Sequence, residues 1–187
     1  MLGQLRIEGY AIVSIDGMIA DGCRRMVDEL KVEADSRHFL AGLNRAVLVV
    51  HGRHSQEDDD KAVRRRRLIL THDVDGIAKH PRGPNAHLWN PAQIPFLEAC
   101  RRIGVVEGTV AVTGGTSVFG LFLELGFDAF HLSRSSRVQL PGGRAVFPQV
   151  PTQTPEDVLQ AHGLTPGPVQ VLDAQAGVSL VTWTRQA

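Results

Sequence analysis

The chain has 187 residues, and its 20 basic and 20 acidic side chains give a formal net charge of zero. This balance argues against a polybasic nucleic-acid binder or a highly charged disordered chain, and the length fits one domain over residues 1–187. The two cysteines, Cys23 and Cys100, form neither a CxxC pair nor a disulfide framework. No run approaches about 18 apolar residues and the first residues lack a signal-peptide pattern, so we expect a soluble, cytoplasmic protein.

The predicted elements alternate between the hydrophobic periods of strands and helices. Residues 5–15 are rich in β-branched and aliphatic side chains, and they predict a strand that ends at the turn Asp16-Gly17. The closing block, residues 168–186, predicts two strands joined around residues 174–177. Between these blocks we expect, in chain order, a helix at 32–44, a strand at 46–50, the start of a short helix within 54–63, a strand at 66–70, an irregular loop at 73–87, a helix at 94–104, a strand at 109–113, a helix at 116–126 and a strand at 127–135.

This order of elements predicts the fold class. Strands that alternate with helices favour an α/β layer sandwich with a mostly parallel central sheet. The closing pair of strands predicts an antiparallel edge on that sheet. Because no internal repeat or low-complexity linker divides the sequence, we expect a single domain.

The strongest local signal is VAVTGGTSVFGLFLELG, in which a buried strand ends at Thr113, Gly114 and Gly115 turn the chain, and a helix begins. Thr116 or Ser117 is the expected cap of that helix. A helix start carries unpaired N–H groups and a partial positive charge, and glycine lets a phosphate approach them closely. The segment therefore predicts a pyrophosphate site. It also fits an ordinary strand-to-helix turn, and it is not a GxGxxG fingerprint.

Four blocks carry a wider likeness: AIVSIDGMIADG (11–22), VLVVHGRHS (47–55), VTGGTSVFGLFLELGFDAFHLS (112–133) and RVQLPGGRAVFP (137–148). The first resembles a strand and substrate loop with a Ser-x-Asp-Gly-x-Ile-Ala pattern, and the second a strand with its Gly-Arg turn. The third resembles a Gly-Gly cofactor turn with its helix and next strand. In this order and spacing they resemble the dihydrofolate reductase-like superfamily, especially the reductase domain of bacterial riboflavin biosynthesis and its stand-alone relatives.

The resemblance implies a three-layer α/β/α sandwich and an NADPH-dependent reductase that acts on a pyrimidine-like or pterin-like substrate. An adenosine 2′-phosphate is a dianion near neutral pH, which an arginine and a helix N-terminus would suit. The alternative for Arg53 and His54 is an exposed, solvated loop. The cofactor-binding residues implied by the resemblance are Gly52, Arg53, His54, Ser55, Thr71, Gly114, Gly115, Thr116, Ser117 and Val118.

Two carboxylates, Asp16 and Asp35, are the candidate catalytic residues. The resemblance places Asp16 and Ser14 in a loop that closes over the substrate, although Asp16 also fits a turn residue bonded to the local backbone. Asp35 lies about where dihydrofolate reductases carry the acid that contacts the pterin, and a partly buried carboxyl group could donate a proton. It fits equally well an ordinary acid in a first helical turn. The candidate substrate-binding residues are Ser14 in the substrate loop, Ser133 on a strand, and Arg24 as a phosphate contact.

Two other functions stay open at this point. One is a true dihydrofolate reductase, although residues 11–35 lack the Pro-Trp pair that is usual in its substrate loop. The other is a non-catalytic nucleotide-binding protein on the same fold. The basic stretch within 56–67 has no interleaved aromatic residues and the histidines lack metal-ligand spacing, so we expect neither nucleic acid nor metal. An apolar edge strand around Trp183 predicts a homodimer.

Overall fold

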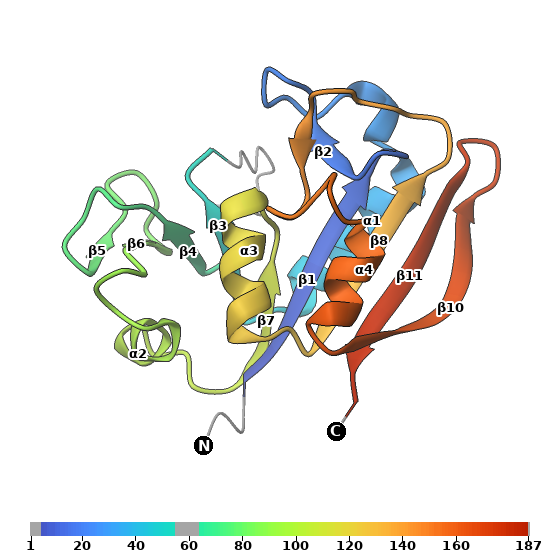
Figure 1. Cartoon of the computed structure of the whole chain (residues 1–187). Coiled ribbons are helices and arrows are strands. Elements are labelled where there is room, and N and C mark those ends of the chain that lie inside the picture. Colours follow the sequence, from blue (N-terminus) through green and yellow to red (C-terminus); the bar gives the residue numbers. More distant parts are fainter. Residues whose placement is uncertain (1–4, 55–63, 187) are drawn as a thin grey trace.

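The computed structural model describes residues 5–54 and 64–186, and within them a nine-stranded sheet forms the centre of the molecule (Figure 1). Its strands are β1 (Leu5–Val13), β3 (Leu48–Gly52), β4 (Arg67–Leu70), β5 (Ile77–Lys79), β6 (Ala86–Trp89), β7 (Gly108–Val112), β8 (Ala129–Ser135), β10 (Leu164–Asp173) and β11 (Val178–Arg185). Across the sheet they lie in the order β10-β11-β8-β1-β7-β3-β4-β6-β5.

The central strands of this sheet, from β8 to β6, are all parallel. The strand β11 pairs antiparallel with β8, and β10 pairs antiparallel with β11. These pairings confirm the predicted mostly parallel sheet with an antiparallel C-terminal edge. At the opposite side β5 pairs antiparallel with β6, which adds a second antiparallel edge that the sequence did not indicate.

Helices cover both faces of the sheet: α1 (Glu33–Arg45), α2 (Phe96–Arg102), α3 (Thr116–Leu125) and α4 (Pro155–Ala161). In Figure 1, α3 and α4 lie in front of the sheet and α1 lies behind it. Phe119 of α3 belongs to the large core cluster, together with side chains of α2 and α4, whereas Leu43 of α1 belongs to a separate small cluster. Alternate residues of β1 divide between the two, because Val13 joins the large cluster and Tyr10 the small one.

The structure corrects the prediction for three segments. The loop expected at 73–87 contains β5 and the start of β6, which are too short to show a clear period. The helix α4 was not expected, although Thr154 caps it by accepting a hydrogen bond from the Asp157 backbone N–H at 3.1 Å. A small second sheet pairs β2 (Met18–Ala20) with β9 (Arg144–Ala145).

The helix expected to begin within 54–63 lies outside the described residues apart from its first position. Between β2 and α1 the chain forms a short 3-10 turn, Asp28–Leu30, which buries Leu30 against the sheet. Among the described segments, every helix is too short or too polar to span a bilayer.

Candidate functional site

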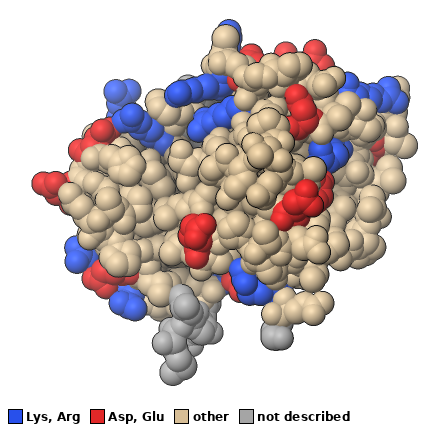
Figure 2. Space-filling view, viewed as in Figure 1, with Lys and Arg blue, Asp and Glu red and all other residues tan. Residues whose placement is uncertain are grey.

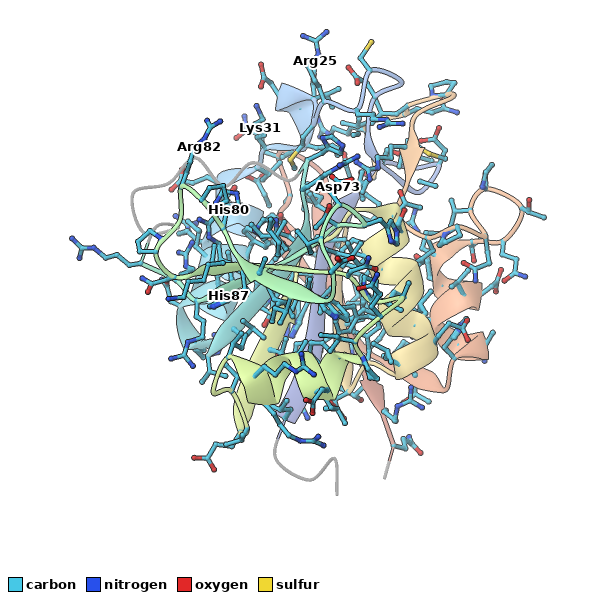
Figure 3. All side chains as sticks on the ribbon, turned by 90° about the vertical axis from the view of Figure 1, so that its left-hand side faces the viewer. Arg25, Lys31, Asp73, His80, Arg82 and His87 are labelled. Atoms are coloured by element: carbon cyan, nitrogen blue, oxygen red, sulfur yellow. The ribbon has the colours of Figure 1, made fainter. Side chains whose placement is uncertain are left out.

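A cavity of about 670 Å³ lies between α1 and the strands β1 and β8, and it extends to the turn that follows β7. Ligands of parallel α/β sheets usually bind at this carboxyl edge of the strands. On the face seen in Figure 2, most Lys and Arg side chains lie in the upper half, which carries β2 in Figure 1. Figure 3 shows Arg25 and Lys31 projecting at that upper edge. Among the described residues, the wall has one carboxylate, Asp35, and several cations: Arg24, Arg25, Lys31, Arg65 and Arg144.

Asp35 and Ser133 both line this cavity. Asp35 lies in the first turn of α1, and Ser133 lies on β8 with only 1% of its surface exposed. Burial raises the pKa of the Asp35 carboxyl group, and a hydrogen bond with the Ser133 side chain opposes part of that rise. A carboxyl group that keeps its proton to higher pH, and that faces a cavity, can serve as a general acid. The structure thus brings two predicted site residues together.

The turn formed by Gly114 and Gly115, called here the glycine turn, leads from β7 into α3. Gly114 has a φ of 101°, which a side chain would strain. The expected cap by Thr116 or Ser117 is wrong, because Gly115 is the N-cap residue and no side chain caps α3. The Thr116 hydroxyl instead donates to the Ala145 carbonyl oxygen at 2.5 Å.

The start of α3 suits an anion better than the other helix starts do. The helices α1, α2 and α4 each have an acidic residue in their first turn. The helix α3 has neither an acid there nor a side-chain cap for its first N–H groups. Since these N–H groups carry a partial positive charge, the residues present fit the phosphate groups of a dinucleotide.

The ends of β3 and β4 lie next to the glycine turn. The Gly52 N–H donates to the Gly114 carbonyl oxygen at 2.9 Å, which joins two of the predicted cofactor segments. Arg53 forms an ion pair with Asp73, and the Thr71 hydroxyl donates to the same carboxylate at 3.1 Å. Arg53 and Thr71 are therefore brought together through Asp73, an acid that the sequence argument did not consider. Ser55 lies outside the described residues.

The predicted substrate loop is fastened by hydrogen bonds within the protein. The Ser14 hydroxyl donates to Asp16 Oδ1 at 2.6 Å, and the Leu140 N–H donates to the same oxygen at 3.0 Å. Burial acts to raise the pKa of Asp16, but these hydrogen bonds hold it below the ordinary value. Neither Ser14 nor Asp16 is among the cavity-lining residues. Their hydrogen bonds stabilise the turn itself, and the catalytic role of Asp16 stays a prediction.

A polar cluster that was not among the predicted site residues contributes Tyr10, His38 and His131 to the cavity wall. The Tyr10 hydroxyl donates to Glu8 Oε2 at 2.8 Å, and the ring of Tyr10 stacks on that of His131 at 4.5 Å. A hydrogen bond with His131 lowers the pKa of Glu8 to about 2, against the opposing effect of burial. His38 lies beside His131, with ring centroids 5.1 Å apart. The sequence signal for this cluster is the pair of polar residues Glu8 and Tyr10, which lie at alternate positions of a buried strand and so point to the same face of the sheet.

Comparison with known proteins gives only structural matches. No protein-family model matches the sequence, and no curated protein sequence gives a significant match. A Shewanella sp. PV-4 protein assigned to riboflavin biosynthesis aligns with a TM-score of 0.69 and 18% identity, covering 97% of this chain and 99% of that one. Enterococcus faecalis dihydrofolate reductase, solved with NADP(H) and RAB-propyl, aligns with a TM-score of 0.62 and 14% identity over 97% of both chains.

A longer Thermotoga maritima chain is also similar. It is a diaminohydroxyphosphoribosylaminopyrimidine deaminase and 5-amino-6-(5-phosphoribosylamino)uracil reductase, and it aligns with a TM-score of 0.60 and 18% identity. The match covers 98% of this chain but 57% of that one. The three structures align with nearly the whole of this chain.

The chain has the dihydrofolate reductase-like fold. The fold predicted from the four sequence blocks is thereby confirmed.

The dihydrofolate reductase-like fold gathers most of the predicted site residues at one edge of the sheet. Asp35, Ser133, Arg24, His54 and Gly115 all line the cavity. Two residues of this edge escaped prediction. Asp73 follows β4 within the segment taken for an irregular loop, and Arg144 lies on β9, whose position depends on pairing with the distant β2.

Proposed function

We propose that the chain is an NADPH-dependent reductase of the riboflavin-biosynthesis type, which transfers hydride to a pyrimidine-like or pterin-like substrate. The observation that carries the proposal is one cavity whose wall holds both Asp35, a carboxyl group with a pKa raised by burial, and Gly115, which precedes the uncapped start of α3. The names of the similar structures, two of riboflavin biosynthesis and one dihydrofolate reductase, support the same reaction class.

The chain's own residues have separable tasks in this reaction. A bound nicotinamide dinucleotide supplies the hydride. The N–H groups at the start of α3 would bind its phosphates, and Arg53 with Thr71 would bind its adenosine phosphate. The Asp35 carboxyl group donates the proton to the nitrogen of the C=N bond whose carbon receives the hydride, with Ser133 fixing its orientation. Two further cations of the cavity wall, Arg25 and Lys31, favour a substrate that carries a phosphate.

A turnover assay tests the substrate class. NADPH oxidation is followed with 5-amino-6-(5-phosphoribosylamino)uracil, with its dephosphorylated form and with dihydrofolate. We expect the phosphorylated aminouracil to give the highest kcat/KM. Fast turnover of dihydrofolate with inhibition by methotrexate would instead make the protein a dihydrofolate reductase. Cofactor binding without turnover of any of the three would favour a non-catalytic nucleotide-binding protein.

The pair of Arg53 and Asp73 gives a prediction about cofactor preference. Asp73→Asn should tighten NADPH binding about three- to tenfold and leave NADH binding unchanged, because the carboxylate competes with the 2′-phosphate for the Arg53 guanidinium. The effect is limited because the side chains of Arg53 and Asp73 are 55% and 67% exposed. The dissociation constants of both dinucleotides are measured by titration. Asp75→Asn, an exposed acid of the same loop, is the matched control, and equal NADPH affinity in all three proteins would contradict this prediction.

The strand around Trp183 is not the edge that the sequence predicted, because β11 lies between β8 and β10 and Trp183 is buried. We further propose that two copies pair through the β10 edge instead. Val169 and Val171 of this edge strand are each 68% exposed. Large apolar side chains that are exposed at an open strand edge favour association with a second copy. The mass measured by light scattering at micromolar concentration should be that of a dimer. A monomeric mass there would remove the proposal.

A further inference from the structure

Arg144 lies directly on the glycine turn. Its guanidinium Nε donates to the Thr116 hydroxyl at 3.3 Å. A Cβ atom at Gly115 would lie 2.5 Å from Arg144 Nη2, so a side chain at that position would displace the guanidinium from the turn. A cation from the small β2–β9 sheet therefore lies beside the first turn of α3, where the N–H groups have no side-chain cap.

Arg24 brings a second cation to the same part of the cavity. It is the one non-glycine residue with a positive φ, 63°, in the described part of the chain. Asp21 Oδ1 holds the surrounding turn by accepting the Cys23 and Arg25 N–H groups at 2.9 and 2.8 Å. Burial, and after it the charge of Arg24, lowers the pKa of Arg144. The two guanidinium groups are thus close enough to interact.

In the described part of the chain, neither guanidinium has a carboxylate partner. Across residues 5–54 and 64–186, no ion pair involves Arg24 or Arg144, and both side chains line the cavity. The single carboxylate of the described cavity wall, Asp35, is bonded to Ser133. Two like charges beside a positive helix end repel one another, and an anion bound between them would remove that cost.

We propose that Arg144 and Arg24 bind the diphosphate of the dinucleotide from the side of the substrate loop, opposite the N–H groups of α3. This inference rests on the proposed function, because it requires that a dinucleotide binds. The inference also implies that cofactor binding stabilises the substrate loop. Arg144 pairs with Ala20 in the β2–β9 sheet, so a phosphate held by Arg144 fixes the loop that covers the cavity.

The test compares the dissociation constants of NADPH and NADH across single variants, measured by calorimetry. Arg144→Gln keeps a polar side chain of similar reach, and it should weaken both dinucleotides by the same factor, about tenfold, since both carry the diphosphate. Arg24→Gln should do the same to a smaller extent. Arg53→Gln should weaken NADPH only, because the 2′-phosphate is the group that NADH lacks. Arg137→Gln, an exposed arginine outside the cavity wall, controls for net charge.

Further measurements separate a lost phosphate contact from a loss of folding and from a failure of the proposed function. Thermal unfolding shows that each variant is folded, and the salt dependence of NADPH affinity should fall in Arg144→Gln because one phosphate contact is lost. Unchanged affinity of Arg144→Gln for both dinucleotides would overturn the inference while the proposed function stands. A raised KM for the phosphorylated aminouracil, with dinucleotide affinities unchanged, would assign Arg144 to the substrate phosphate and also overturn it. Wild-type protein that binds neither dinucleotide would sink the proposed function itself.

Discussion

Asp35→Asn is expected to lower kcat about 100- to 1000-fold while the dissociation constant of NADPH changes less than about twofold. The amide keeps the size of the carboxyl group and its contact with Ser133, but it has no proton to give at an accessible pKa. Because burial raises the pKa of Asp35, kcat of the wild type should fall as the pH rises through that raised value. The variant should show no such decline. Stopped-flow turnover across pH, with NADPH titrations alongside, makes the comparison.

The matched control for this experiment is Ser133→Ala, which leaves the acid in place and removes its hydrogen-bond partner. It should cost far less in kcat, and it should raise the pKa seen in the rate profile, because the hydrogen bond with Ser133 opposes the rise caused by burial. A wild-type pH profile without a decline above the ordinary aspartate range, or an Asp35→Asn variant that retains full kcat, would exclude Asp35 as the proton donor.

The same carboxyl group affects stability with a definite sign. A group whose folded pKa is raised stabilises the fold below its unfolded pKa, and that contribution is lost as the pH rises through the folded value. Asp35→Asn should therefore be more stable than the wild type at alkaline pH and should show a weaker pH dependence there. Such a gain in stability with a loss of activity is typical of a functional buried carboxyl group.

Gly114→Ala is expected to lower the free energy of unfolding by about 2–4 kcal/mol and to weaken NADPH binding more than tenfold. Two effects add at this residue. Its φ of 101° strains any side chain, and a Cβ atom would lie 2.8 Å from the buried ring of Phe119. The glycine turn would have to move, and with it the first N–H groups of α3. Urea unfolding and calorimetric titration with NADPH measure the two results.

Gly104→Ala separates the backbone effect from the clash. Gly104 also has a positive φ, 73°, but nothing lies within 4 Å of the position that a Cβ atom would take. This variant should therefore lose only about 1 kcal/mol, which is the backbone term, and should bind NADPH normally. Equal losses of stability in the two variants would mean that contact with Phe119 contributes nothing, contrary to the geometry.

The sequence predicts best those parts of the site whose contacts are between residues close together in the chain. The strand, glycine turn and helix around Gly114 were predictable because their hydrophobic runs and turn residues are adjacent in the chain. Asp35 and Ser133 were predictable only through the family resemblance, since their contact joins α1 to β8. Thr154-Pro155-Glu156-Asp157 carried a cap, a proline at the first helical position and early acids, so α4 could have been found.

The other site residues come together through the pairing of strands that lie far apart in the chain. The residue pattern of a single sequence does not show which strands pair. Arg144 reaches Gly115 only because β9 pairs with β2, and both strands are too short to leave a period. Asp73 meets Arg53 because β4 lies beside β3 in the sheet. The sequence placed Arg53 near a phosphate but gave no sign that an acid already occupies its guanidinium.

The central claim is that the cavity binds a nicotinamide dinucleotide through the glycine turn. Calorimetric titration of the wild-type chain with NADPH, at low ionic strength and near neutral pH, tests it most directly. We expect saturable binding of one NADPH per chain, with a dissociation constant of about 1–100 µM, and we expect Gly114→Ala to abolish most of it. No saturable binding of NADPH or NADH up to about 1 mM would contradict the claim.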